Sequence, residues 1–159
     1  MKIDRRGQTG MTLIESMVAI LLFSMGILAL VGMYAAATSR TSDSQYRIEA
    51  ANYANRIIGQ IWANVDRSTA ATLTNTLVAF QHRPGGGGCG FSGSVSANAA
   101  VTQWVGDITA VGTGLPGAED TMQQILVDTA NANRVTVTVC WRAPTDSTTH
   151  RHVVVANIN

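Results

Sequence analysis

The sequence predicts an α+β fold, in which one long N-terminal helix packs on a small antiparallel sheet. Residues 16–39 carry no charged side chain. Apolar residues then recur at helical spacings of three and four as far as Val65. After Leu115-Pro116-Gly117 the apolar period changes to two, which is typical of strands. A chain of 159 residues has room for one long helix and one modest domain.

The uncharged run from Ser16 to Ser39 is long enough to span a membrane. As a helix it would extend about 36 Å at ~1.5 Å per residue, which exceeds the hydrocarbon thickness of a bilayer. Glu15 directly precedes this run, and a carboxylate there costs on the order of a few kcal/mol near the membrane centre and less near its edge. Glu15 therefore needs a partner. Ahead of it, the leader Met1–Thr9 is basic, with Lys2, Arg5 and Arg6 against Asp4.

Two ordinary membrane-targeting segments are alternatives. A cleaved secretory signal has a basic start, but its apolar core is usually roughly 7–15 residues long and ends at a small-residue cleavage site. Here the nearest such site is Tyr34-Ala35-Ala36-Ala37, and a signal would not normally place Glu15 before the core. An uncleaved anchor explains the length of the run but gives no purpose to Gly10 or Glu15.

The N-terminal residues resemble the type IV pilins and their pseudopilin relatives. The matching features are the basic leader ending in Gly10, the segment Met11-Thr12-Leu13-Ile14-Glu15 and the apolar helix. The resemblance implies that a prepilin peptidase cuts between Gly10 and Met11 and methylates the new amino terminus. Most members carry Phe where this chain has Met11. Glu15 matches the family glutamate that pairs with the amino terminus of a neighbouring subunit, which would supply the missing partner.

The resemblance also implies the domain organisation and the partners. Residues 1–10 would be the leader, 11–39 the transmembrane and assembly half of the helix, and 40–159 a pilin globular domain that includes the amphipathic half. A basic leader stays in the cytoplasm, so the domain is expected in the periplasm of a bacterial inner-membrane protein. The expected partners are the prepilin peptidase, other minor and major pilins and the inner-membrane assembly platform.

Cysteine usage and charge limit the other possibilities. Cys89 and Cys140 both follow the apolar run, so an oxidising periplasm favours one disulfide between them. Two unpaired buried thiols are the alternative. Charged residues make up 13% of the chain and the net charge is +1, so no basic patch argues for nucleic acid as the main partner.

The helix is expected to continue from about Met11 to Val65 and to become amphipathic in its second half. Gly26 and Gly32 interrupt the apolar half, where they would permit either local melting or close packing against other helices. The residues expected on the packed side of the second half are Tyr46, Ala50, Tyr53, Ala54, Ile57, Ile58, Ile61, Trp62 and Val65.

The segment between the long helix and the strands is less regular. Residues 67–81 have helical apolar spacing, but their threonines weaken a helix. Residues 83–90 are glycine-rich and predict a loop tied down by Cys89 rather than a phosphate-binding loop, because no Lys-Ser/Thr follows. Residues 97–112 predict a helix whose apolar side carries Val101, Trp104, Val105, Ile108 and Val111.

Three strands complete the predicted fold. Residues 122–128 and 152–158 flank the clearest strand, 134–141, in which valines alternate with threonines and Cys140. Turns are expected at 131–133 and 144–147. The simplest arrangement is a three-stranded antiparallel meander on the amphipathic half of the long helix, an arrangement that also resembles pilins.

Short motifs in the C-terminal part narrow the resemblance. Trp104, then Leu115-Pro116-Gly117, then the valine-rich strand Val135–Trp141 resemble the PilV-type minor pilins, also called pilus modification proteins. This implies a low-abundance subunit that primes assembly of a type IV pilus or lies at its tip. The alternative within the superfamily is a minor pseudopilin of type II secretion, of the GspI type.

No enzyme, cofactor or metal site is expected. His150 and His152 would share one face of a strand, but no third ligand is evident nearby, so we expect exposed edge residues. Five acidic residues of the domain lack a spacing that suggests acid–base chemistry. They are Asp107, Glu119, Asp120, Asp128 and Asp146. A membrane-anchored periplasmic binding module, adhesive or DNA-engaging, remains a candidate of a different class.

Overall fold

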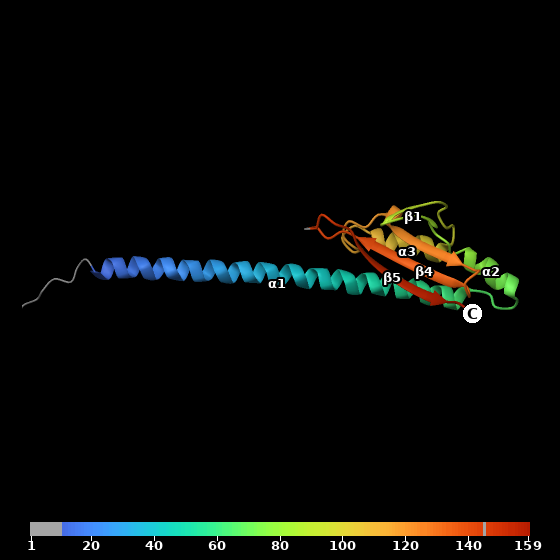
Figure 1. Ribbon diagram of the computed structural model, residues 1–159, viewed down its shortest axis with the longest axis horizontal. Coiled ribbons are helices and arrows are strands. Elements are labelled where there is room, and N and C mark those ends of the chain that lie inside the picture. Colours follow the sequence, from blue (N-terminus) through green and yellow to red (C-terminus); the bar gives the residue numbers. More distant parts are fainter. Residues whose placement is uncertain (1–10, 145) are drawn as a thin grey trace, which may run out of the picture. The chain divides into compact units, whose positions relative to one another are not determined.

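A computed structural model describes residues 11–144 and 146–159 of the chain, without the side chains of Ser39 and Arg40. The long helix and the antiparallel sheet are both present, which confirms the predicted α+β fold (Figure 1). By its internal contacts the chain divides into two compact units that meet between Ser42 and Asp43. The elements are α1 (Met11–Asn64), α2 (Ala70–Val78), β1 (Gly85–Gly87), β2 (Gly90–Ser92), α3 (Ala99–Thr109), the 3₁₀ turn η1 (Asp120–Met122), β3 (Gln123–Asp128), β4 (Arg134–Trp141) and β5 (His150–Asn157).

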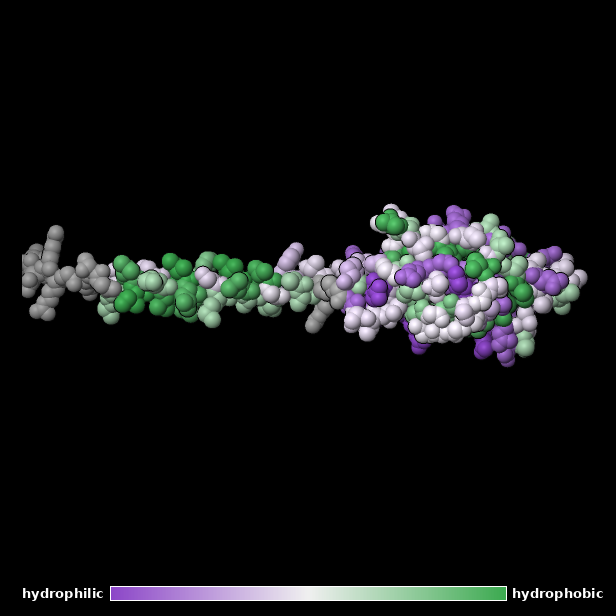
Figure 2. Space-filling model, turned by 90° about the horizontal axis from the view of Figure 1, so that it is seen from above, coloured by the Kyte–Doolittle hydropathy of each residue, from purple (hydrophilic) through white to green (hydrophobic). Residues whose placement is uncertain are grey.

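The first unit contains the apolar part of α1. Every side chain described between residues 11 and 38 is exposed, including large ones such as Phe23 and Leu28. Figure 2 shows this stretch as a nearly continuous apolar surface. By length and composition α1 is able to cross a membrane, and it is the one such helix among the described residues.

The second unit is built on the part of α1 that runs from Asp43 to Asn64. Ala50, Ala54, Ile57 and Ile61 are completely buried and follow one another at spacings of four, three and four, which aligns them on one face of the helix. The predicted amphipathic half is thus confirmed. Trp62 departs from the prediction, because it remains 41% exposed and its ring lies beneath the guanidinium of Arg67, 5.1 Å from the ring centroid.

Strands β3, β4 and β5 form the predicted antiparallel meander, in that order. In the register, Ile125 of β3 lies opposite Val137 of β4, which lies opposite Val154 of β5. Val135, Val137, Val139 and Trp141 alternate along β4 and are all buried in the core. β5 begins at His150, two residues before the predicted strand start.

Helix α3 ends earlier than predicted. Val101, Trp104, Val105 and Ile108 are buried as expected, but the helix stops at Thr109 and Val111 is fully exposed. The backbone explains the stop: Leu115 N–H donates to the Ile108 carbonyl at 2.9 Å, which folds the following loop back onto the helix. At Gly114 a Cβ would lie 2.3 Å from that same carbonyl oxygen, so the close approach requires glycine.

The segment between α1 and α3 contains one element that the sequence left ambiguous and one that it predicted as a loop. Residues 70–78 form α2, whose start is fixed by a reciprocal capping box between Thr69 and Thr72. The glycine-rich segment expected to be a loop instead forms a short β1–β2 hairpin. Gly86 in this hairpin has φ +83°, and a Cβ there would meet the Gly90 carbonyl at 2.3 Å.

A disulfide joins Cys89, in the turn between β1 and β2, to Cys140 of β4. The predicted pairing is therefore present. Next to the disulfide, the buried side chain of Gln123 makes hydrogen bonds with both the carbonyl and the N–H of Cys140. Its amide donates to the Cys140 carbonyl at 3.0 Å, and its oxygen accepts from the Cys140 N–H at 3.3 Å. Two links thus fasten the hairpin and β3 to the end of β4.

Candidate processing and assembly site

The expected cleavage site lies at the start of α1. Gly10 is outside the described residues, whereas Met11 is the first helical residue and its side chain is 79% exposed. Glu15 follows one helical turn later. Residues four apart share a face of a helix, so Met11 and Glu15 lie on the same side of α1. The structure thus presents a carboxylate on the face that carries the expected new amino terminus.

Three hydroxyl groups in the apolar part of α1 are satisfied within the helix itself. The hydroxyls of Ser16, Ser24 and Thr38 each donate to the carbonyl four residues earlier, at 2.8, 2.7 and 3.0 Å. Such bonds suit a segment that leaves water, because an unpaired polar group in hydrocarbon costs several kcal/mol. Glu15 is exposed and makes no hydrogen bond or ion pair with any residue in the described part of the chain. Its carboxylate is available to a partner outside that part.

Comparison with known families agrees with this geometry. The Prokaryotic N-terminal methylation motif matches residues 5–31, which span the end of the basic leader, Glu15 and the first turns of the apolar run. The chain carries a type IV pilin-like prepilin signal. This signal implies processing by a prepilin peptidase and pilin-type partners, and the apolar helix fits membrane anchoring. Searches of curated proteins and of solved structures found no match.

In the second unit, helices α1 and α3 are joined by polar contacts around a buried indole. Trp104 is 1% exposed, and its Nε1 donates to the carbonyl of Tyr53 at 2.9 Å. The Tyr53 hydroxyl donates to the Asp107 carbonyl at 3.2 Å, and Arg56 pairs with the Asp107 carboxylate at 2.6 Å. Trp104 is therefore part of the core, as its spacing predicted.

A second polar cluster surrounds His82, which the sequence did not single out. Its Nδ1 accepts from the backbone N–H of Ser96 at 3.3 Å, which places the proton of the neutral ring on Nε2. Nε2 faces the Asp120 carboxylate at 3.4 Å, and Arg83 pairs with the same carboxylate. Burial lowers the pKa of His82, an effect that Asp120 partly opposes and Arg83 reinforces.

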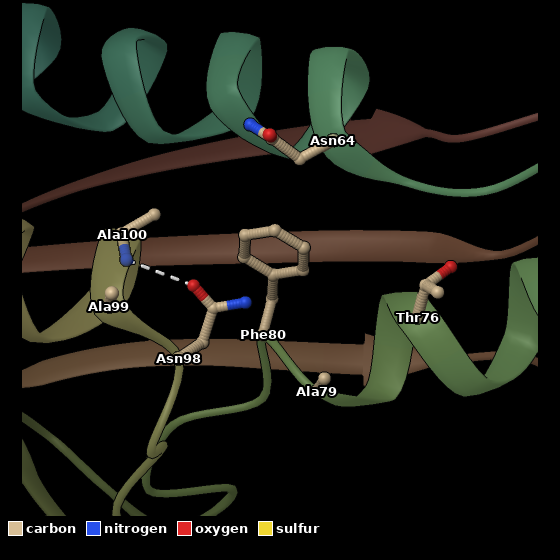
Figure 3. Close-up of a pocket in the computed structure, with 7 residues that line it drawn as sticks. All are labelled: Asn64, Thr76, Ala79, Phe80, Asn98, Ala99 and Ala100. Carbon is tan, nitrogen blue, oxygen red and sulfur yellow. Dashed lines mark hydrogen bonds between the residues drawn. The ribbon is translucent and has the colours of Figure 1, made fainter.

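The surface hollow in Figure 3 lies between the ends of α1 and α2 and the start of α3, and has a volume of about 340 Å³. The Phe80 ring lies at its centre, and its polar groups are already engaged. Asn64 donates to the Gln60 carbonyl at 2.8 Å, and the Asn98 side chain caps α3 by accepting from Ala100 N–H at 2.9 Å. None of the seven described residues that line it is titratable, so the hollow offers no group for acid–base chemistry.

The two histidines of β5 lie on an edge strand of the sheet, as predicted, but they are not fully exposed. His150 and His152 are both partly buried, on the face of β5 whose Val154 and Ala156 pack against the core. His150 stacks on Trp141, with the ring centroids 5.6 Å apart. Its Nε2 lies 2.6 Å from a carboxylate oxygen of Asp146. The spacing of four residues between Asp146 and His150 was the one sequence feature that could have indicated this pair.

Proposed function

We propose that the protein is a minor pilin, which is processed by a prepilin peptidase and then primes or joins the assembly of a type IV pilus. The observation that carries the proposal is the methylation motif over residues 5–31, which overlaps an exposed apolar helix that begins at Met11. An apolar face of this size is stable only in lipid or against other apolar helices. A pilin subunit meets both surroundings in turn.

In the proposed assembly step, the subunit leaves the inner membrane and its helix enters a bundle of equivalent helices. Lipid contacts are exchanged for helix packing, so the apolar side chains stay out of water throughout. Glu15 then pairs with the charged amino terminus of a neighbouring subunit. A buried charge without its partner is strongly destabilising, so this pairing would select one axial register.

The assignment to the PilV type rests on the resemblance of the C-terminal motifs, all of which belong to the folded second unit. Trp104 is buried in α3, and Val135–Trp141 form the central strand β4. The Leu115-Pro116-Gly117 turn buries Leu115 in the core, and its Pro116 carbonyl accepts from Arg142 N–H at 3.0 Å. A GspI-type pseudopilin of type II secretion is the second candidate, because the N-terminal motif serves both systems.

The proposed role is structural, with residues 40–159 as a periplasmic domain and no catalytic step. The disulfide between Cys89 and Cys140 is consistent with an oxidising compartment. A binding role at the pilus tip would use the surface of this domain. The face of the domain seen in Figure 2 carries both hydrophilic and apolar patches.

The experiment that tests the assembly role compares Glu15→Ala with Glu49→Gln, a carboxylate replacement in the amphipathic half of α1. Both variants are expected to be processed, and only Glu15→Ala is expected to be depleted from sheared pili, by about tenfold or more as for a lost buried charge pair. Wild-type levels of Glu15→Ala in pili would contradict the pairing role. Recovery of the wild type in secretion pseudopili but not in type IV pili would favour the second candidate.

A further inference from the structure

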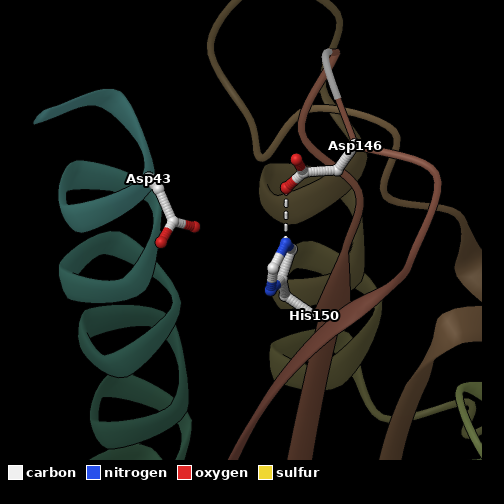
Figure 4. A group of neighbouring side chains, drawn as sticks. All are labelled: Asp43, Asp146 and His150. Atoms are coloured by element: carbon white, nitrogen blue, oxygen red, sulfur yellow. Dashed lines mark hydrogen bonds and ion pairs between the residues drawn. The ribbon is translucent and has the colours of Figure 1, made fainter. Parts of the chain in front are cut away.

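Three ligand-type side chains from distant parts of the sequence meet beside the start of the second unit. Asp43 lies on α1, Asp146 lies in the connection between β4 and β5, and His150 is the first residue of β5. Each contributes one nitrogen or oxygen atom, and these atoms all lie within 4.8 Å of one another. Figure 4 shows the Asp43 carboxylate facing the Asp146–His150 pair.

One atom of this group has no partner within the described residues. The Oδ2 of Asp43 accepts from Arg47 Nε at 3.0 Å, whereas its Oδ1 is shielded from solvent and has no hydrogen bond, although the Asp43 side chain as a whole is 36% exposed. A buried carboxylate oxygen without a partner is costly, and such an atom often marks an ion or a water. The group therefore combines two observations, the spacing of its three donors and the unpaired Oδ1 of Asp43.

We propose that Asp43, Asp146 and His150 form a binding site for a divalent cation of the zinc class. An imidazole with two carboxylates suits a borderline ion such as Zn²⁺ better than the harder Ca²⁺ or Mg²⁺, which prefer oxygen ligands alone. A tetrahedral Zn²⁺ ion with bonds of about 2.0–2.2 Å holds its donors about 3.3–3.6 Å apart. The 2.6 Å contact between His150 Nε2 and the Asp146 carboxylate would have to open to that spacing, whereas the widest separation in the group, at most 4.8 Å, would have to close by about 1 Å. Water takes the fourth position.

Charge also fits this assignment. Two carboxylates and the Arg47 guanidinium leave one net negative charge beside the His150 imidazole, and a divalent cation reverses the sign of that charge. Trp141 stacks on the imidazole and limits how His150 can turn. The ion would join α1 to the connection between β4 and β5, and so fasten the C-terminal strand to the helix at the beginning of the domain.

The test uses the full chain in detergent, carrying an affinity tag without histidine and freed of metal with EDTA. Calorimetric titration with ZnCl₂ is expected to show one saturable site per chain. Asp43→Asn, Asp146→Asn and His150→Ala should each weaken Zn²⁺ binding by about tenfold or more. His152→Ala, which removes a neighbouring imidazole outside the group, should leave it unchanged. Unfolding midpoints in EDTA show whether each variant is folded.

Cobalt(II) gives a readout that needs no variant. A tetrahedral site with one imidazole and two carboxylates should produce intense visible absorption when Co²⁺ replaces Zn²⁺. Absence of saturable Zn²⁺ binding by the wild type would overturn the proposal, as would equal loss of binding in His152→Ala. Unchanged binding in Asp43→Asn would contradict the link to α1, and tighter binding of Ca²⁺ than of Zn²⁺ would contradict the class of ion.

Discussion

The Nε1 of Trp104 donates a hydrogen bond to the backbone carbonyl of Tyr53 at 2.9 Å, across the interface between α3 and α1. That carbonyl belongs to the same helical stretch whose buried residues form one side of the core. The bond thus satisfies the polar edge of a fully buried indole without a second side chain. It also fixes where α3 lies along α1.

We predict that Trp104→Phe destabilises the second unit by about 1–3 kcal/mol. The substitution removes one hydrogen bond, worth about 1 kcal/mol, and leaves space where the larger indole packed. Trp104→Ala should cost about 3–5 kcal/mol. Thermal unfolding of the full chain in detergent measures both values. Trp62→Phe is the matched control, because Trp62 is 41% exposed and its replacement should change the midpoint little.

The disulfide should make a large contribution to stability. Cys89 and Cys140 are 51 residues apart, and closing a loop of that length restricts the unfolded chain by about 4 kcal/mol in the chain-entropy description. The double variant Cys89→Ser/Cys140→Ser should therefore unfold at a clearly lower temperature. Reducing the wild type should lower its midpoint to a similar value. A midpoint insensitive to reduction would show that the bond adds nothing.

Stability should fall on acidification because of His82. Burial lowers the pKa of His82 in the folded protein below the ordinary value of 6.5, so the unfolded chain binds the proton more readily. Stability is fully present above about pH 6.5 and is lost as the pH falls from there toward the folded pKa. Protonation at Nδ1 would also break the bond from Ser96 N–H.

The pH prediction is checked by thermal unfolding between pH 7.5 and pH 5. His82→Asn retains an acceptor for Ser96 but cannot titrate, so its midpoint should fall less than that of the wild type over this interval. The other histidines, His150 and His152, are the same in both proteins and cancel in the comparison. Parallel curves for the wild type and the variant would contradict the role of His82.

Substitutions at the two glycines in the apolar part of α1 can distinguish local melting of the helix from its close packing against neighbouring helices. The helix is continuous through Gly26 and Gly32, and apart from the adjoining backbone of the helix itself a Cβ at either position would meet no atom of the described chain within 4 Å. We predict that Gly26→Ala/Gly32→Ala is inserted, processed and incorporated into pili normally, whereas Gly26→Leu/Gly32→Leu is excluded because neighbouring helices approach closely there. Exclusion of the alanine variant as well would favour melting. Quantifying each variant in membranes and in sheared pili separates the outcomes.

Much of the fold could be predicted because its signals are periodic. The stripe from Ala50 to Ile61 repeats at the helical period, and the valines of β4 alternate at the strand period. Those patterns arise from burial on one face and are visible in the sequence alone. The N-terminal motif was equally visible, since its residues are contiguous.

The features that were missed depend on the backbone or on distant residues. Glycine has little strand preference, so the β1–β2 hairpin resembles a loop in sequence. The end of α3 before Val111 depends on a carbonyl contact that only the folded loop makes. Asp43 and His150 meet through tertiary structure, and nothing local to either residue indicates the other.

The central claim is that the chain is a processed pilin-type subunit. Its most direct test is the intact mass and amino-terminal sequence of the full chain, expressed with and without a prepilin peptidase. The account predicts loss of residues 1–10 and one methyl group on the amino terminus of Met11 when the peptidase is present, and neither change when it is absent. A chain left uncut by the peptidase, or cut near Ala37, would contradict it.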